Sequence, residues 1–245
     1  MMKKILHKIK HLIGRKQIVY PVHANEILQS NVNSTSGGTL EGKNVLIISN
    51  CLEDLGTYKE ILDTEKCHIS MAILDEKNAK GLNIKSYYSL RPSDIKEDTC
   101  LLDTLSGELV GPFDIIINSL SVGADELLFH IDSTENRFDG VKLFYQLSQI
   151  ESDYFIVHNK AGHLLNICLY KNTVQANVVK ASMKNLICGL GVSLGRHGII
   201  VNGITAERSI PREDVIKTGA YLISRYGEVL LGEVMELKPF AGGIQ

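Results

Sequence analysis

Uninterrupted apolar runs that alternate with amphipathic stretches are the feature that most constrains this chain. Asn44–Ser49 (NVLIIS) and Asp114–Asn118 (DIIIN) each have a continuous apolar centre, which is typical of strands buried on both faces of a parallel sheet. Helical patterns lie between such runs, at Leu52–Leu62 and Thr173–Leu194. This alternation predicts an α/β fold with a doubly wound parallel β-sheet and helices on both faces, the Rossmann-like architecture.

The remaining elements follow from the same patterns. Further strands are expected at Cys67–Leu74, Tyr87–Leu90, Tyr154–His158, Ile199–Ile204 and Val229–Leu237, and further helices at Leu127–Ile150 and Arg212–Tyr226. Gly198 stands where it can end the long helix before the strand that begins at Ile199. These elements predict a single domain that covers residues 40–245.

An N-terminal arm, residues 1–39, precedes this domain. Residues 1–16 carry six basic side chains and no acidic one, and their apolar residues recur at helical spacing. Such a basic amphipathic helix suits peripheral contact with an anionic membrane surface, and it equally suits packing on the domain or on a neighbouring subunit. Residues 31–38 (NVNSTSGG) have the composition of a loop that separates the arm from the domain.

Charge and cysteine content exclude several classes of protein. Outside residues 1–16 the chain holds 20 basic and 28 acidic side chains, and this acidic body argues against nucleic-acid binding. No apolar run approaches the roughly 18 residues that span a bilayer, and the arm is too charged for a signal peptide. The five cysteines are scattered without paired spacing, which predicts neither disulfides nor a metal site. A cytoplasmic location is expected, with the arm able to contact the inner membrane surface.

Residues Lys180–Ile204 (KASMKNLICGLGVSLGRHGIIVNGIT) resemble the short-chain dehydrogenase/reductase family. In that family a lysine opens a helix of this length and a GIRVN strand follows, which GIIVN matches here. Arg212–Leu237 is similar to the family's last helix and strand, and Asp114–Asn118 to the strand before its NNAG motif. The resemblance extends over about residues 40–243 and implies the family's fold.

The phosphate-binding turn that the resemblance implies is altered. The family's TGxxxGxG motif aligns with Ser49–Gly56 (SNCLEDLG), where Gly56 is retained and Asp54 replaces the middle glycine. Glu53 and Asp54 put negative charge where the cofactor phosphates would lie, or else they favour the N-terminus of the following helix. We therefore expect no cofactor in the usual pose. The positions that the resemblance implies for an NAD or NADP cofactor are Ser49, Asn50, Gly56, Asp75 and Asn118.

The catalytic YxxxK pair that the resemblance implies is also incomplete. Lys180 keeps the lysine, but Ala176 stands in place of the tyrosine and has no proton to transfer. Tyr170 lies ten residues before Lys180, outside the helix or on another of its faces, and is not expected to take over. The window His158–His163 stands at the serine spacing and contains no serine, so His163 is the candidate substitute acid or base.

These losses predict a degenerate member of the family that lacks normal dehydrogenase catalysis. Its best-preserved stretches correspond to family elements that build two-fold interfaces, so we expect a homo-oligomer, or a hetero-oligomer with an active reductase. The alternative is an NAD- or NADP-dependent oxidoreductase with an atypical site built on Lys180 and His163, acting on a keto-sugar or keto-acyl substrate. The N-terminal residues are similar to reductases encoded with bacterial capsule or lipopolysaccharide genes, which implies a role in surface-polysaccharide biosynthesis.

Overall fold

A computed structural model describes residues 40–74, 88–90, 95, 100–109, 111–122, 140–173, 176–224 and 227–239. The described strands form one seven-stranded sheet in the order β3-β2-β1-β4-β5-β6-β7, and every neighbouring pair is parallel. Their bounds are β1 Asn44–Ser49, β2 His68–Leu74, β3 Tyr88–Leu90, β4 Ile115–Val122, β5 Gly162–Tyr170, β6 Ile199–Glu207 and β7 Val234–Leu237. The predicted arm, residues 1–39, lies outside the described residues.

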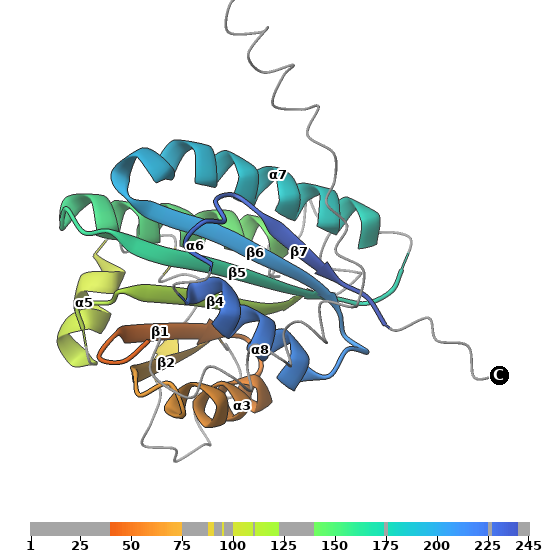
Figure 1. The fold of residues 1–245 in the computed structure, drawn as a ribbon, viewed down its shortest axis with the longest axis horizontal. Coiled ribbons are helices and arrows are strands. Elements are labelled where there is room, and N and C mark those ends of the chain that lie inside the picture. The colour runs from red at the N-terminus through yellow and green to blue at the C-terminus, as the bar shows by residue number, and fades with distance from the viewer. Residues whose placement is uncertain are drawn as a thin grey trace, which may run out of the picture.

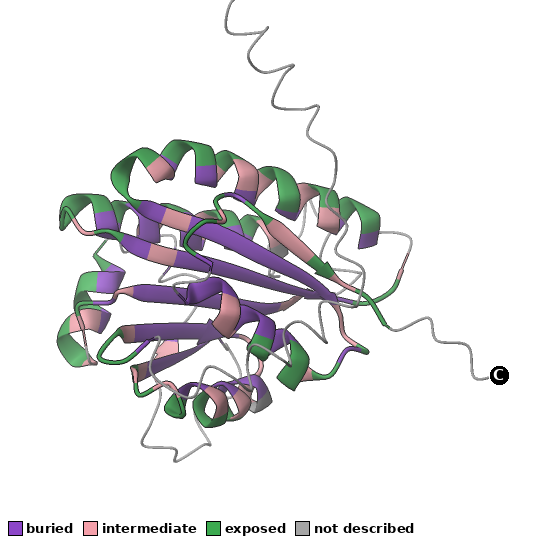
Figure 2. Ribbon diagram, viewed as in Figure 1, coloured by how far each residue is buried: buried purple, intermediate pink, exposed green. Residues whose placement is uncertain are grey.

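Helices cover both faces of this sheet, as Figure 1 shows. Two separate apolar clusters lie between helices and strands, one against α5, α6 and α7 and the other against α3 and α8. Their bounds are α3 Leu52–Asp63, α5 Leu101–Glu108, α6 Gly140–Val157, α7 Ala176–Leu194 and α8 Arg212–Ile223. The central strands are buried along nearly their whole length (Figure 2), which explains their continuous apolar sequences. The prediction of a doubly wound α/β fold is confirmed.

The predicted strand at Tyr154–His158 is wrong. These residues form the last turn of α6 and the turn after it, and the strand lies at Gly162–Tyr170. Tyr154 and Phe155 face the core while Val157 is 76% exposed, which is the burial pattern of a helix rather than of an alternating strand. A short apolar run such as YFIV does not by itself distinguish a buried helical turn from a strand.

Most other elements have the predicted type with shifted ends. The last strand begins at Val234 instead of Val229, and the long helix begins at Ala176 instead of Thr173. The part of the predicted helix Leu127–Ile150 that precedes residue 140 lies outside the described residues. Gly198 has a φ of +74° directly after the helical turn that follows α7, so the predicted end of the helix is confirmed.

The strand order places β1 between β2 and β4. The chain moves outward to β3 on one side of β1 and to β7 on the other, so the seam between β1 and β4 is the topological switch point. In open α/β sheets ligands bind outside the carboxyl ends of the strands at such a point. The carboxyl ends of β1 and β4 therefore define where a ligand site is to be sought.

Close packing of α7 against the loop before β7 depends on two glycines. A Cβ atom added at Gly191 would lie 2.5 Å from the Gly232 Cα atom and 2.7 Å from its nitrogen, so backbone would have to move. We expect Gly191→Ala to lower the free energy of unfolding by about 1–3 kcal/mol, the usual cost of overpacking. Gly189→Ala is the matched control on the same helix, because a Cβ there meets nothing within 4 Å. Urea denaturation of both variants tests this, and equal effects would contradict it.

Candidate functional site

Asn50 bridges the carboxyl ends of β1 and β4. Its side-chain Nδ2 donates a hydrogen bond to the Ser121 carbonyl oxygen (2.9 Å), and the Ser121 N–H donates to Asn50 Oδ1 (2.8 Å). Asn50 occupies the position of the first glycine in the phosphate turn to which the chain is similar. Both ends of its amide are engaged by the backbone across the switch point. Polar groups of the chain itself therefore occupy this end of the seam.

Ser49 supports the turn that leads from β1 into α3. It is fully buried, and its Oγ accepts a hydrogen bond from the Cys51 N–H (3.0 Å) and donates to the Cys51 carbonyl oxygen (3.1 Å). Gly56 lies one turn further along α3, on its exposed side, where an added Cβ would meet nothing within 4 Å. Neither packing nor an unusual backbone conformation requires a glycine at position 56.

Asp54 pairs with an arginine from the other end of the chain. Its carboxylate is 1% exposed, and Oδ1 lies 3.0 Å from the Arg212 Nε atom at the start of α8. The first turns of α3 and α8 are thus joined by an ion pair on one face of the sheet. The sequence left open whether Asp54 lies at a cofactor phosphate position or stabilises the N-terminus of α3. In the structure the Arg212 guanidinium balances its negative charge.

Asn118 lies in a buried polar cluster rather than at the switch-point edge. Its side chain is fully buried and donates hydrogen bonds to Glu151 on α6 and to Asn166 on β5. Of the five candidate cofactor-binding residues, Ser49 and Asn50 lie at the end of β1, Gly56 lies further along α3, and Asn118 faces the core. Asp75 lies outside the described residues.

Lys180 lies at the carboxyl end of the sheet, in the first half of α7. Its Nζ atom is 2.9 Å from Glu236 Oε1 on β7, and it sits 5.5 Å from the centre of the Tyr170 ring. Glu236 also pairs with Lys238, at 3.4 Å. Lys180 is therefore held between a carboxylate and an aromatic face.

Tyr170, which the sequence analysis set aside, lies beside Lys180 in the structure. It ends β5, and the return of the chain into α7 brings Lys180 over its ring. Burial, together with the nearby Glu236 and Glu207 carboxylates, raises the pKa of Tyr170 to about 12. The apolar run HLLNICLY is the sequence signal for the strand that brings Tyr170 to the carboxyl edge of the sheet.

The structure does not bring His163 and Lys180 together. His163 is the second residue of β5 and pairs in register with Ile115, the first residue of β4, so it lies at the amino edge of the sheet. Seven residues of extended strand, about 23 Å, separate it from Tyr170 at the other edge. Burial lowers the pKa of His163. The prediction that His163 could act together with Lys180 assumed a strand at Tyr154–His158, and the actual strand, Gly162–Tyr170, places His163 at the opposite edge of the sheet.

The end of β5 also supplies no serine. The window His158–His163 precedes most of the strand, and the carboxyl end of β5 reads Cys168-Leu169-Tyr170. Burial raises the pKa of the Cys168 thiol to about 12, which keeps it protonated and unreactive at neutral pH.

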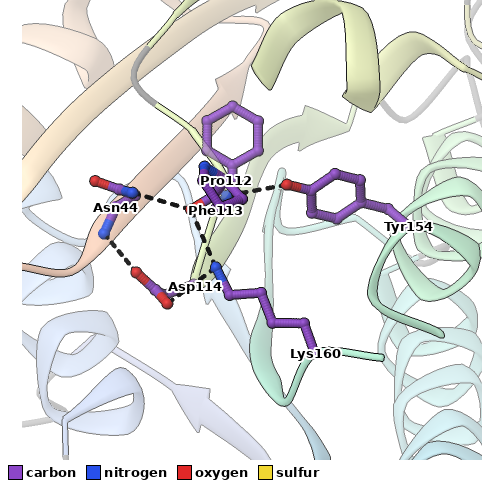
Figure 3. Close-up of polar contacts among 6 residues, drawn as sticks. All are labelled: Asn44, Pro112, Phe113, Asp114, Tyr154 and Lys160. Atoms are coloured by element: carbon purple, nitrogen blue, oxygen red, sulfur yellow. Dashed lines mark hydrogen bonds and ion pairs between the residues drawn. The ribbon is translucent and has the colours of Figure 1, made fainter. Parts of the chain in front are cut away.

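A second polar cluster joins the amino ends of β1 and β4 (Figure 3). Asp114 accepts a hydrogen bond from the Asn44 backbone N–H (2.8 Å) and pairs with Lys160 (3.1 Å). The Pro112 carbonyl oxygen accepts from both Asn44 Nδ2 and Lys160 Nζ, at 2.9 and 3.1 Å. These contacts join the start of β1, the start of β4 and the turn before β5, and they lie at the edge opposite the switch-point site.

Two classes of site are not found among the described residues. No group of three or more His, Cys, Asp or Glu side chains in the described part of the chain is placed to hold a metal ion. Within the same residues, no helix has both the length and the apolar character that crossing a membrane requires.

Several solved structures have a fold similar to that of this chain. An enoyl-acyl carrier protein reductase from Bacillus cereus, solved with NADP+ and indole naphthyridinone, matches with a TM-score of 0.59 at 18% identity, over 82% of this chain and 96% of that one. A short chain dehydrogenase from Leptospira borgpetersenii with bound NAD+ matches with a TM-score of 0.60 at 16% identity, over 81% of this chain and 92% of that one. An enoyl-[acyl-carrier-protein] reductase (NADH) from Aquifex aeolicus matches with a TM-score of 0.59 at 22% identity, over 80% of this chain and 95% of that one.

These similarities show the fold. The chain has the Rossmann-type fold of short-chain dehydrogenases and enoyl reductases, as its resemblance to that family implied. No protein-family model matches the sequence, and no curated protein sequence is detectably similar to it.

The Asp54–Arg212 pair makes a prediction about stability. Because Asp54 is buried and Arg212 is 28% exposed, Arg212→Met would leave a buried carboxylate without its cation. We expect a loss in the free energy of unfolding toward the lower end of the roughly 3–5 kcal/mol typical of broken buried pairs. The double variant Asp54→Leu/Arg212→Met should recover most of that loss, because no charge remains buried. Strictly additive effects in a urea-denaturation cycle would contradict a direct interaction.

Proposed function

We propose that this protein has the short-chain dehydrogenase fold without dehydrogenase chemistry, and that it acts by assembling with a second subunit. The observation that carries the proposal is the Asn50–Ser121 bridge, which places a side chain and its hydrogen bonds at the switch point. The proposed context is surface-polysaccharide biosynthesis, supported only by the similarity of the N-terminal residues. Contact of residues 1–16 with a membrane stays a prediction.

The residues at the switch point do not fit a dinucleotide. A pyrophosphate bound there needs close approach to bare backbone and free N–H groups at a helix N-terminus. Here Asn50 supplies a side chain where a glycine is required, and that side chain is engaged at both ends by Ser121. Asp54 also supplies a side chain at a glycine position, and its carboxylate is buried in the ion pair with Arg212. These contacts support the absence of an NAD or NADP cofactor.

The groups near Lys180 also support the loss of proton transfer. A catalytic acid or base works best with a pKa near the operating pH. The pKa of Tyr170 is raised to about 12, which is opposite to the shift that an active tyrosine requires. Lys180 lies against the face of the Tyr170 ring and forms an ion pair with Glu236. The arrangement is that of a structural ion pair.

The outward surface of α7 supports assembly. Its exposed positions include one charged residue, Lys184, and otherwise small or uncharged side chains. These uncharged positions form the assembly face: Asn177, Val178, Ala181, Asn185, Gly189, Val192 and Ser193. By contrast, the exposed sides of α3 and α8 carry several acidic and basic residues. A helix that remains in water normally keeps a charged outer face, so the assembly face suits contact with another subunit.

Titration calorimetry tests the loss of cofactor binding. We expect no heat of binding when NADH or NADPH is added up to millimolar concentration. Binding in the micromolar range would overturn this part of the proposal and support the alternative, an NAD- or NADP-dependent oxidoreductase with an atypical site. In that case Lys180→Ala should abolish the activity found by screening keto-sugars and keto-acyl compounds. His163→Ala is then the control, since His163 lies at the opposite edge of the sheet.

Light scattering coupled to gel filtration tests the assembly face. We expect the purified 27.1 kDa chain to run as a homodimer or larger, and Val192→Lys, at a 69%-exposed position on that face, to shift it toward the monomer. Val229→Lys is the matched control, because Val229 is 85% exposed but lies in the loop before β7. A monomeric wild-type chain that also retains no reductase on co-purification would remove the proposal's support.

A further inference from the structure

A buried carboxyl group that the proposed function does not use lies between α6 and the sheet. Glu151 on α6 is 0% exposed, as are Asn118 on β4 and Asn166 on β5, which are register partners in the sheet. Ser148, one turn before Glu151, completes the cluster. Four polar side chains are thus enclosed on the face of the sheet that is otherwise packed with apolar residues.

The hydrogen bonds of this cluster use both amide hydrogens of Asn118 and one of Asn166, and they leave two acceptor oxygens without a hydrogen. Asn118 Nδ2 donates to Glu151 Oε2 (3.0 Å) and to Asn166 Oδ1 (2.9 Å), and Asn166 Nδ2 donates to Ser148 Oγ (3.4 Å). Within the described residues, Glu151 Oε1 and Asn118 Oδ1 are buried without any partner. Both are oxygens of neighbouring side chains, and neither the Asn166 amide nor the Ser148 hydroxyl forms a hydrogen bond with them.

One proton resolves both deficits. A carboxylate only accepts hydrogen bonds, whereas a protonated carboxyl group has an O–H donor. A buried acceptor without a partner costs free energy, and an unpaired buried carboxylate costs far more. We propose that Glu151 is a proton-binding site, which in the folded protein carries a proton on Oε1 and donates it to Asn118 Oδ1. The amide and the carboxyl group then satisfy each other through two hydrogen bonds.

The surroundings of Glu151 favour the neutral form. Desolvation by burial raises the pKa of Glu151 to about 8, and the hydrogen bond from Asn118 opposes this only in part. Other titratable side chains on the elements that pack around Glu151 are neutral, exposed or paired elsewhere. On β5 and α6, Cys168 is a buried thiol, Asp153 is exposed, and the Tyr154 hydroxyl accepts a hydrogen bond from the Phe113 N–H. On α5 and α7, Asp103 pairs with His158 and Lys180 pairs with Glu236.

The consequence is a proton-dependent attachment of α6 to the sheet. Because the pKa of Glu151 is higher in the folded than in the unfolded chain, its contribution to stability is complete in acid and is lost as the pH rises toward about 8. For a single proton the unfolding equilibrium constant then rises by up to about tenfold per pH unit in this interval. Above it Glu151 is ionised in both states and the dependence ends.

Urea denaturation as a function of pH tests the inference. The urea concentration at the midpoint of wild-type unfolding should decrease as the pH is raised from 5 to 8. Glu151→Gln should remove that dependence, because glutamine offers an amide donor to Asn118 Oδ1 and does not titrate. Asp153→Asn is the matched control on the exposed side of α6 and should keep the wild-type pH profile. A wild-type pH dependence in Glu151→Gln would overturn the inference.

A direct measurement on the unmodified chain keeps the inference testable if Glu151→Gln does not fold. The side-chain carboxyl carbon of Glu151, followed by NMR, should stay protonated at neutral pH and titrate near 8. Titration at the ordinary value for a glutamate, near 4.5, would overturn the inference and indicate instead that a buried water supplies both hydrogens. Neither result depends on whether a cofactor binds or the chain assembles.

Discussion

Parallel pairing of β4 with both β1 and β5 determines which side chains can meet in this molecule. In a parallel sheet all amino ends lie at one edge and all carboxyl ends at the other. Ser49, Asn50 and Tyr170 are therefore brought to one edge, and Asn44, Asp114 and His163 to the opposite edge. Each conclusion about the site, including the separation of His163 from Lys180, depends on this arrangement.

Some elements of this sheet could be predicted from the sequence and others could not. The strands at Asn44–Ser49 and Ile199–Glu207 and the helix α7 were predictable, because their apolar residues are continuous or follow a helical period. β5 was not, because the apolar run Tyr154–Val157 just before it has the same local composition. Only the packing of Tyr154 and Phe155 against the core decides that this run is helical. Because the strand was predicted eight residues too early, His163 was expected near Lys180, whereas Tyr170 is the residue that β5 brings there.

The polar contacts of the candidate site could not be predicted from the sequence, because the partners lie far apart along the chain. Arg212 lies more than 150 residues from Asp54, and Asn118 meets Glu151 only because α6 returns over the sheet between β4 and β5. Charge and hydrogen-bonding capacity can be read from residue types, but partners cannot. The altered glycine-rich turn was evident from the sequence, whereas the contact that Asn50 makes in its place was not.

The seam between β1 and β4 is fastened at both ends, by Asn50 and Ser121 at one edge and by Asn44, Asp114 and Lys160 at the other. These side-chain contacts join the part of the sheet that contains β1, β2 and β3 to the part that contains β4, β5, β6 and β7. Separating the two halves of the sheet would therefore require breaking side-chain contacts at both ends of the seam as well as the backbone hydrogen bonds between β1 and β4.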